Sequence, residues 1–400
     1  MESSTRSPHF SGCVEFARNL IRTPSLPGQE GDVARLVREE MRRLRYHNVS
    51  VDEVGNVMGK IQGEGRAAPI LFNAHLDHVD AGDVARWPFP PFEARIHEDR
   101  IWGRGAVDIK GPLAAQVYGA ASLRQPGIRP PGDVYVSAVV QEEIGGLGAR
   151  WLAQSLPASL IVVGEPSRNE LRRGHRGRAE IVLRVRGRSV HASIPDAGVN
   201  PLAVVARFIV ALESLGLPED PELGSATVAP TLVGTDQSSA NVIPGEAWLT
   251  CDWRSLPGET GAKMQALLQR IAEGCRIPGA EAAVEAPAQE RISYTGRSQL
   301  VSAHHPAFLL SAEDPALRAA GEILDRAIGL KAPAGIWSFA TDGGHFSAAG
   351  GTVIGFGPGD DRLAHTVRES IEISDLETAV MGNRALALEL AAQLGQLASS

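Results

Sequence analysis

Apolar and polar positions along the first 177 residues follow the periods of alternating helices and strands. Apolar residues recur at helical spacing over residues 9–22 and 30–44, and again over 111–125. Short apolar runs that are typical of strands lie around these helices, over residues 47–61, 69–77, 132–143 and 158–166. Strands that alternate with helices predict an α/β domain with a largely parallel, buried sheet.

The pattern changes at about Arg178, where a strand with alternating faces begins. A helix with proline in its first turn and further strands and a helix follow, so that the expected elements are 179–187, 200–215, 225–234, 245–255, 260–275 and 280–289. Their order, βαββαβ, is that of a split-βαβ, ferredoxin-like α+β unit, which can fold as a domain of its own.

The α/β pattern resumes after about residue 297. A helix is expected over 314–329 and a further apolar strand over 351–359. We therefore predict that residues 1–177 and 297–400 form one domain, and that residues 178–296 form a second domain inserted into it.

Composition narrows the class of protein. The chain has 400 residues, of which 43% are hydrophobic and 22% charged, and this length suits two domains of a soluble protein. The net charge of -8 argues against a general nucleic-acid-binding surface, and no apolar run reaches the length that spans a membrane. The N-terminus lacks a secretory signal pattern, and the three scattered cysteines predict buried thiols in a reducing cytoplasm.

Polar side chains collect at the end of the run LFNAHLDHVD, residues 71–80. Residues i and i+2 of a strand project to the same face, so His75 and Asp77 are expected to be neighbours. An imidazole beside a carboxylate is the usual arrangement of a metal-ligating histidine and its orienting acid. A solvated turn would explain the same residues, and the motif alone is common.

Two further stretches carry acidic residues in unusual places. Asp108 lies between a glycine-rich turn and a helix start, where a carboxylate would also serve as a helix cap. The apolar strand before Glu142 and Glu143 leads directly into two adjacent carboxylates, whose repulsion a nearby cation would relieve. Adjacent residues point in different directions, so one carboxylate could bind a metal while the other faces a metal-bound water.

Another apolar strand ends on Glu165, and His365 follows a later one in the loop DDRLAHTVRES. Open α/β sheets place their ligand sites at such strand ends. Taken together, these motifs offer two histidines and three carboxylates. Such a mixture of ligands suits two Zn²⁺ ions, with Co²⁺ or Mn²⁺ as substitutes. No motif for an organic cofactor is found.

The ordered motifs HLD, GRGAVDIKG, QEE, GEPS, HAS and AHT resemble those of the co-catalytic zinc exopeptidase and deacylase family. This family includes acetylornithine deacetylase, succinyl-diaminopimelate desuccinylase and the glutamate carboxypeptidases, and the resemblance covers nearly the whole chain. It implies a mixed sheet flanked by helices, with the inserted α+β domain as a lid and dimerisation domain. The stretch GHRGRAEIVLRVRGRSVHAS looks most like a hydrolase branch linked by name to selenium metabolism.

The resemblance implies roles for the strand-end residues. Asp108 would bridge two metal ions. His75 and Glu165 would complete one metal site, and Glu143 and His365 the other.

Two more residues take roles in the reaction by the same resemblance. Asp77 would orient the histidine before it, and Glu142 would be the general base that deprotonates the metal-bound water and passes the proton to the leaving amine.

The inserted domain and the last domain also match family positions. His191 would cross a dimer interface and stabilise the oxyanion in the partner's site. Asn241 and Arg254 match positions that contact a substrate carboxylate, which the planar guanidinium of arginine can bind bidentately. ATDGGHF matches a substrate-contacting loop near Thr341 and Asp342.

Some features have no clear family role. His78 and Asp80 are expected to be solvated or to support the site from outside. The basic cluster RRGHRGR, residues 172–178, either attracts an anionic substrate or forms the hinge into the inserted domain.

The resulting expectation is a cytoplasmic, homodimeric, dizinc hydrolase that cleaves the amide bond of a small N-acyl amino acid with a free carboxylate. A dipeptidase or glutamate-type metallocarboxypeptidase is the alternative with the same chemistry. A non-catalytic ligand-binding relative is the alternative from another class, although such proteins usually lose ligands or the base.

Overall fold

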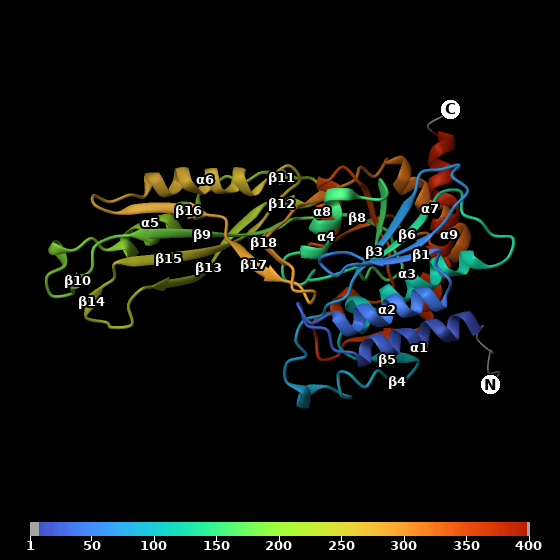
Figure 1. Ribbon diagram of the computed structural model, residues 1–400. Helices are drawn as coiled ribbons and strands as arrows, with labels where there is room; N and C mark the ends of the chain where they lie inside the picture. Colours follow the sequence, from blue (N-terminus) through green and yellow to red (C-terminus); the bar gives the residue numbers. More distant parts are fainter. Residues whose placement is uncertain (1–7, 398–400) are drawn as a thin grey trace.

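The computed structural model describes residues 8–397, which form an α/β part and an elongated part that projects from it (Figure 1). In the described residues, the α/β part is built on a nine-stranded mixed sheet with the order β1-β2-β6-β3-β7-β22-β8-β20, and β21 pairs with β8. The strands are β1 (Asn48–Val51), β2 (Val57–Ile61), β3 (Ile70–His75), β6 (Val134–Val139), β7 (Leu160–Val163), β8 (Arg172–His175), β20 (Phe308–Leu309), β21 (Gly335–Trp337) and β22 (Thr352–Gly355).

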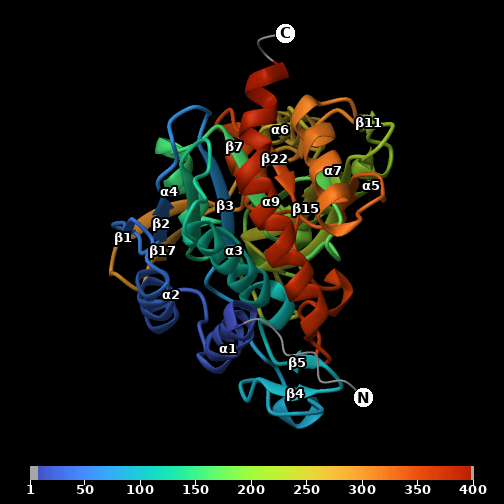
Figure 2. The same cartoon turned by 90° about the vertical axis from the view of Figure 1, so that its right-hand side faces the viewer.

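Helices cover both faces of this sheet. They are α1 (Pro8–Arg22), α2 (Gly31–Arg43), α3 (Gly111–Ala121), α4 (Leu147–Leu152), α7 (Pro315–Ile328), α8 (Gly343–Ala348) and α9 (Ile373–Leu397). Figure 2 shows α9 and α3 side by side in front of the strands. A small sheet of β4 (Arg95–His97), β5 (Arg100–Trp102) and β23 (Ser370–Glu372) lies below. No helix in residues 8–397 combines the length and apolar character needed to cross a bilayer.

The central strand β3 is apolar at four of its six positions, and Asn73 and His75 are polar. Successive side chains of a strand point to opposite faces, so a strand covered on both sides carries apolar residues on both. Ile70 and Phe72 pack into the core that includes Leu113 of α3, whereas Leu71 packs into the core that includes Phe346 of α8. The sheet is therefore held rigidly between two helical layers, and its strand ends are fixed in space.

The projecting part has the predicted βαββαβ order. Its main elements are β9 (Arg178–Arg186), α5 (Pro201–Glu213), β13 (Thr227–Thr235), β15 (Glu246–Arg254), α6 (Gly261–Gly274) and β16 (Glu281–Glu285). The antiparallel sheet order is β13-β15-β9-β16, and β19 (His304–His305) also pairs with β9. Asn200 caps α5 by accepting a hydrogen bond from the Leu202 amide at 3.0 Å, with Pro201 in the first turn. The expected fold class, including the inserted α+β unit, is confirmed.

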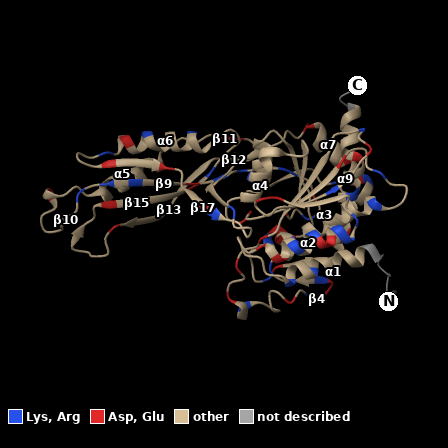
Figure 3. Ribbon diagram, in the orientation of Figure 1, with Lys and Arg blue, Asp and Glu red and all other residues tan. Residues whose placement is uncertain are grey.

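Smaller strands complete the projecting part: β10 (Val190–His191), β11 (Glu219–Asp220), β12 (Gly224–Ser225), β14 (Val242–Ile243), β17 (Ala288–Ile292) and β18 (Ser298–Ser302). Acidic and basic residues are interspersed on β9 and β16 (Figure 3), where Arg184 pairs with Glu285 at 2.9 Å. The three cysteines are buried and unpaired, as expected from the sequence.

The hairpin of β17 and β18 reaches back to the α/β part. At its tip the Tyr294 hydroxyl donates a hydrogen bond to the Gly55 carbonyl at 2.9 Å. Gly55 has φ +101°, and a Cβ there would overlap the Tyr294 ring, so only glycine fits. Beside this contact the Gln141 side-chain amide donates to the Ile292 carbonyl at 2.8 Å. The hairpin is thus anchored next to the residue that precedes Glu142.

Candidate metal centre

Four neighbouring parallel strands, β6, β3, β7 and β22, end at the same edge of the main sheet. His75 is the last residue of β3, and Glu142, Glu165 and His365 follow the ends of β6, β7 and β22. Because parallel strands present their carboxyl ends together, residues far apart in the sequence meet at one place.

The first group of candidate metal ligands consists of His75, Asp108 and Glu165. His75 Nε2 lies 3.0 Å from Asp108 Oδ1 and 3.7 Å from Glu165 Oε1. All three side chains are buried, and their ligand atoms lie within 4.8 Å of one another.

The second group consists of Asp108, Glu143 and His365. His365 Nε2 lies 3.1 Å from Asp108 Oδ2 and 3.1 Å from Glu143 Oε1. Asp108 therefore presents Oδ1 to one group and Oδ2 to the other. This is the arrangement that a carboxylate needs in order to bridge two cations.

Asp77 connects the end of β3 to the turn that carries Glu142 and Glu143. Its Oδ1 lies 3.4 Å from His75 Nδ1 and accepts a hydrogen bond from the Glu142 amide at 3.1 Å. Its Oδ2 accepts from the Glu143 amide at 3.1 Å. Asp77 is fully buried, so it fixes both the imidazole ring and the turn that carries the two glutamates.

Glu142 lies in that turn, and its amide donates to Asp77, but within residues 8–397 its carboxylate forms no ion pair with a lysine, arginine or histidine. Burial is the main cause that raises the pKa of Glu142 well above its ordinary value, and the nearby charges of Asp342 and Glu165 act in the same direction. A carboxylate whose pKa is shifted toward neutrality is suited to accept and return a proton.

Glu369 holds the backbone of Asp108 and was not predicted from the sequence. Its Oε1 accepts hydrogen bonds from the amides of Val107 and Asp108 at 3.0 and 3.1 Å, and its Oε2 accepts from Arg104 Nη1 at 2.5 Å. The one available signal was its position four residues after His365 in AHTVRES. A buried carboxylate with three donors fixes the peptide that presents the shared ligand.

Replacement of Glu369 by glutamine is expected to weaken metal binding by about 10- to 100-fold, because the exchange breaks the ion pair with Arg104 and loosens the Asp108 backbone. Competition with a chromogenic chelator measures this affinity. An affinity equal to that of the unchanged protein would show that Glu369 does not position the ligand.

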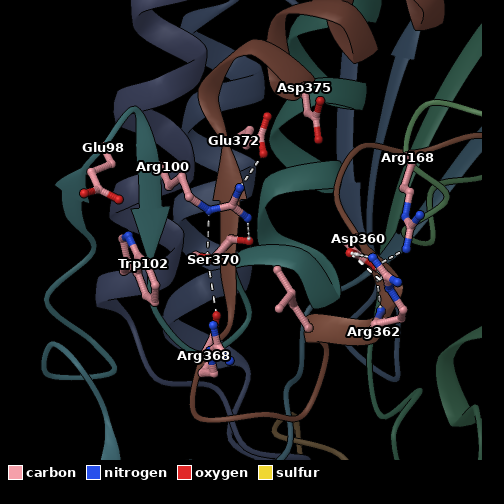
Figure 4. A pocket seen from close by; sticks show the side chains of 11 residues that line it. Glu98, Arg100, Trp102, Arg168, Asp360, Arg362, Arg368, Ser370, Glu372 and Asp375 are labelled. Atoms are coloured by element: carbon pink, nitrogen blue, oxygen red, sulfur yellow. Dashed lines mark hydrogen bonds and ion pairs between the residues drawn. The ribbon is translucent and has the colours of Figure 1, made fainter.

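The loop that carries His365 is tied to the loop that follows Glu165 (Figure 4). Asp360 accepts a hydrogen bond from Arg168 Nη2 at 2.7 Å and another from Arg362 Nη2 at 2.7 Å. The cavity in Figure 4 has a volume of about 590 Å³, and its lining residues do not include the five candidate ligands. Its arginines therefore support the ligand loop rather than line the metal centre.

His78 differs from the expectation of a solvated residue. Its side chain is 1% exposed, and Nε2 accepts a hydrogen bond from the Ser25 amide at 2.9 Å. It supports the strand end from outside the ligand groups, which was the second of the two expectations for this residue. Asp80 is exposed, as expected, and accepts a hydrogen bond from the Gly82 amide.

The basic cluster 172–178 is divided between β8 and β9 and does not form one patch. Its side chains pair separately: Arg173 with Glu222, Arg176 with the Ser225 carbonyl, and Arg178 with Asp252. Arg172 pairs with Glu170, and the His175 ring is buried. The cluster thus joins the two parts of the molecule, which favours the hinge interpretation.

His191 and Asn241 lie together at the end of the projecting part that is farthest from the main sheet (Figure 1). The Ala192 amide donates to the Asn241 carbonyl at 2.8 Å, and both predicted residues are exposed. Within one chain they are not brought to the ligand groups.

The other two predicted substrate contacts lie nearer the junction of the two parts. Arg254 ends β15 and pairs with Asp252 at 2.7 Å, and the next residue, Ser255, pairs with Gly177 through backbone hydrogen bonds. Thr341 is buried, and its hydroxyl lies 3.1 Å from His175 Nε2.

The two candidate ligand histidines have raised pKa values. Burial lowers the pKa of His75, but the interactions with Asp108 and Asp77 outweigh it and raise the pKa well above its ordinary value. Hydrogen bonds to Asp108 and Glu143 raise the pKa of His365 to about 10. Metal-free protein thus holds protons on the nitrogens that would bind a cation.

The carboxylates also fit a cation. Burial, and next the charge of Asp108, raise the pKa of Glu165 and of Glu143. Burial opposes ionisation of Asp108 as well, but hydrogen bonds to His365 and His75 lower its pKa well below the ordinary range. Among residues 8–397, no lysine or arginine forms an ion pair with these three carboxylates. Buried carboxylates without cationic side chains are the donor set that divalent metals need.

Metal binding is expected to release at least one proton per subunit at pH 8. The pKa of His365 is about 10, so its ring is protonated at this pH and must become neutral to bind a metal. Calorimetric titration of metal-stripped protein in buffers of different ionisation enthalpy counts the protons. A His365→Asn variant should release fewer, and an unchanged count would contradict the assignment.

A mixed sheet whose strand ends gather imidazoles and carboxylates around one shared aspartate is the framework of a metal-dependent hydrolase. The profile of peptidase family M20/M25/M40 matches residues 71–389. The chain belongs to this family and hydrolyses amide bonds, which confirms the resemblance seen in the sequence.

Related sequences and solved structures support the assignment to this family. An uncharacterised Escherichia coli K12 protein, YgeY, is 28% identical over 371 residues, which is 91% of each chain. The succinyl-diaminopimelate desuccinylase of Cereibacter sphaeroides is 31% identical over 295 residues, covering 70% of this chain and 76% of that enzyme. The fold matches the aminopeptidase PepT of Bacillus cereus with a TM-score of 0.74 at 19% identity, over 96% of this chain and 99% of that one. It also matches the Bacillus subtilis protein YXEP, described as a dinuclear metal-binding M20 peptidase, with a TM-score of 0.73 at 18% identity, over 96% of this chain and 99% of that one.

Proposed function

We propose that the protein is a dinuclear zinc hydrolase that removes the acyl group from a small N-acyl amino acid with a free carboxylate. The observation that carries this proposal is the geometry of Asp108, which presents one oxygen to each of two ligand groups beside Glu142. The similarity to a succinyl-diaminopimelate desuccinylase supports a deacylase.

Each residue of the centre has a role in this reaction. His75 and Glu165 would hold one ion, Glu143 and His365 the other, and Asp108 both. Two bound ions would lower the pKa of a shared water and polarise the scissile carbonyl.

Glu142 would take the proton from the attacking water and deliver it to the leaving amine. Asp77 would hold the His75 ring and the Glu142 backbone in place, because its carbonyl lies 3.1 Å from His75 Nδ1 and its carboxylate accepts from the Glu142 amide.

Arg254, Asn241 and Thr341 are the proposed contacts of the substrate, with Arg254 binding its carboxylate. The position of Asn241 and His191 at the far end of the inserted part means that they could serve only the site of a second subunit. Exposed apolar side chains on this part, Leu232 (67% exposed) and Val233 (61%), support a homodimer that covers them.

A mixture of His191→Ala and Glu142→Ala proteins is expected to regain activity that neither has alone. One site of each mixed dimer would combine an intact Glu142 with an intact His191 from the partner, so up to about a quarter of the normal sites would return. Mixing after brief subunit exchange and assaying hydrolysis measures this. No recovery, with mixed dimers demonstrated, would place His191 outside the partner's site.

The substrate class is tested with metal-stripped protein supplied with Zn²⁺, Co²⁺ or Mn²⁺. N-acetyl, N-succinyl and N-carbamoyl amino acids are compared with dipeptides. Metal-dependent hydrolysis of the N-acyl compounds with the higher kcat/KM supports the proposal. Faster cleavage of dipeptides favours a dipeptidase, a possibility that the fold match to a peptidase keeps open. Absence of hydrolysis or bound metal would contradict both.

A further inference from the structure

The connection between α1 and α2, residues 23–30, takes no part in the proposed reaction, yet it contacts the segments from which the metal centre is built. The Thr23 carbonyl accepts a hydrogen bond from Lys110 Nζ at 2.6 Å, and this lysine closely follows the shared aspartate in the sequence. The Ser25 hydroxyl donates to the carbonyl of Leu76, the residue after the first ligand histidine, at 2.7 Å. The first half of the connection therefore supports two ligand-bearing segments, and its last residue reaches a third.

Glu30 is the last residue of this connection, and its side chain reaches the turn that carries Glu142. Its Oε1 accepts a hydrogen bond from the Gln141 amide at 3.2 Å, directly before Glu142. Glu30 occupies the N-cap position of α2, where a polar side chain would ordinarily accept from the first amides of the helix, but it caps no amide of that helix. Its carboxylate is therefore directed at the turn and not at its own helix.

Glu30 is a buried acid without a cationic partner. It is 0% exposed, and no lysine, arginine or histidine of residues 8–397 forms an ion pair with it. Burial, and next the charge of Asp77, raise the pKa of Glu30 to about 7. A buried acid without a cation destabilises a folded protein, so the stability of the fold does not explain this residue. What it supplies is an acceptor for the buried amide of Gln141.

Gln141 is the residue through which Glu30 acts on Glu142. Its φ of +55° lies in the left-handed region, which residues other than glycine rarely adopt without support from their surroundings. The support comes from two sides. Glu30 accepts from the main-chain amide of Gln141, and the Ile292 carbonyl accepts from its side-chain amide at 2.8 Å. Gly28 allows the two segments to lie this close, since a Cβ there would lie 3.2 Å from the Ile292 carbonyl oxygen.

Two buried acids thus hold consecutive amides of the turn. Glu30 accepts from the amide of Gln141, and Asp77 accepts from the amides of Glu142 and Glu143 at 3.1 Å. The Glu142 carboxylate forms no ion pair of its own with a lysine, arginine or histidine in the described part of the chain, residues 8–397. Its direction is therefore set by the backbone that the two acids hold.

We propose that Glu30 is a positioning residue of the reaction: by holding the Gln141 amide, it keeps the Glu142 carboxylate directed at the two ligand groups. This inference rests on the proposed role of Glu142 as the base. Glu30 belongs to neither ligand group, so loss of its acceptor should slow proton transfer and leave the metal ions in place. The hydrogen bond requires an oxygen acceptor and no charge, so glutamine should replace Glu30 and a side chain without oxygen should not.

The test compares Glu30→Met with Glu30→Gln on the Zn²⁺-loaded enzyme. Both substitutions keep the length of the side chain, and methionine lacks the oxygen acceptor. With the N-acyl amino acid or dipeptide that the unchanged protein hydrolyses fastest, Glu30→Met should lower kcat by on the order of 10- to 100-fold, the usual effect of losing a contact that orients a reacting group. KM and zinc content should stay within about twofold, and Glu30→Gln should retain kcat within about threefold.

Glu39→Met is the matched control, because Glu39 is an exposed acid of the same helix and should leave kcat, KM and zinc content unchanged. The expected split between kcat and zinc content also excludes a general loss of structure, which would lower both. Full kcat in Glu30→Met, equal losses in Glu30→Met and Glu30→Gln, or loss of zinc from Glu30→Met would each overturn the inference.

Hydrogen exchange separates failure of this inference from failure of the proposed function, because it needs no turnover. Mass spectrometry of the zinc-loaded proteins follows the amides of residues 140–146. Faster exchange of this segment in Glu30→Met, but not in Glu30→Gln, supports the hold on the turn even if no amide bond is hydrolysed. Equal exchange in both variants and the unchanged protein overturns it even if hydrolysis is found.

Discussion

Glu142→Gln is expected to lower kcat by on the order of 10²–10⁴-fold while both metal ions stay bound. The exchange keeps the size of the side chain and removes its ability to accept a proton. Glu142 lies outside both ligand groups, since His75, Asp108 and Glu165 form one and Asp108, Glu143 and His365 the other. Steady-state kinetics together with metal analysis by mass spectrometry measure the two effects separately.

The adjacent residue supplies the comparison. Glu143→Gln should lower the metal content as well as kcat, because Glu143 lies in a ligand group with Asp108 and His365. Full activity of Glu142→Gln would exclude Glu142 as the base. Loss of metal from it would make Glu142 a ligand.

Asp108→Ala is expected to remove both metal ions and to reduce activity more than Glu142→Gln does. One oxygen of Asp108 faces each ligand group, so a single substitution takes a ligand from each. The histidines and glutamates that remain would also be left without the negative charge that they share. Metal content after dialysis and kcat/KM at saturating Zn²⁺ measure the loss.

Asp80→Ala is the control for this substitution. Asp80 is an exposed carboxylate near the same strand end and accepts one backbone hydrogen bond. It should leave metal content and kcat/KM unchanged. Retention of one tightly bound ion by Asp108→Ala would show that the two groups bind metal independently.

The sequence allowed much of this architecture to be predicted, because its signals are local. The apolar run that ends on His75 is a strand buried on both faces, and its polar end can lie nowhere but at the sheet edge. Asp77 follows the strand end rather than continuing it, yet the two-residue spacing still predicted that it would lie beside His75. The resemblance then supplied the order of Asp108, Glu165 and His365.

The remaining features depend on contacts that no local pattern contains. The sequence left open whether His78 is solvated or supports the site from outside, and packing against the Ser25 segment buries it. His305 and His345 each stand in an ordinary local sequence, and they lie side by side because β19 pairs with β9 next to α8. Glu369 stands in an ordinary loop sequence, and its partners, the amides of Val107 and Asp108, lie more than 250 positions away.

The anchored tip of the β17–β18 hairpin ties the projecting part to the turn that carries Glu142. Tyr294 is fixed on Gly55, and the Ile292 carbonyl is held by Gln141, whose φ of +55° sets the direction of the chain into Glu142. A swing of the inserted domain would pull on this link and so reorient the carboxylate that follows it. If the projecting part closes over a substrate and Glu142 is the base that we propose, one movement would both enclose the substrate and align the carboxylate.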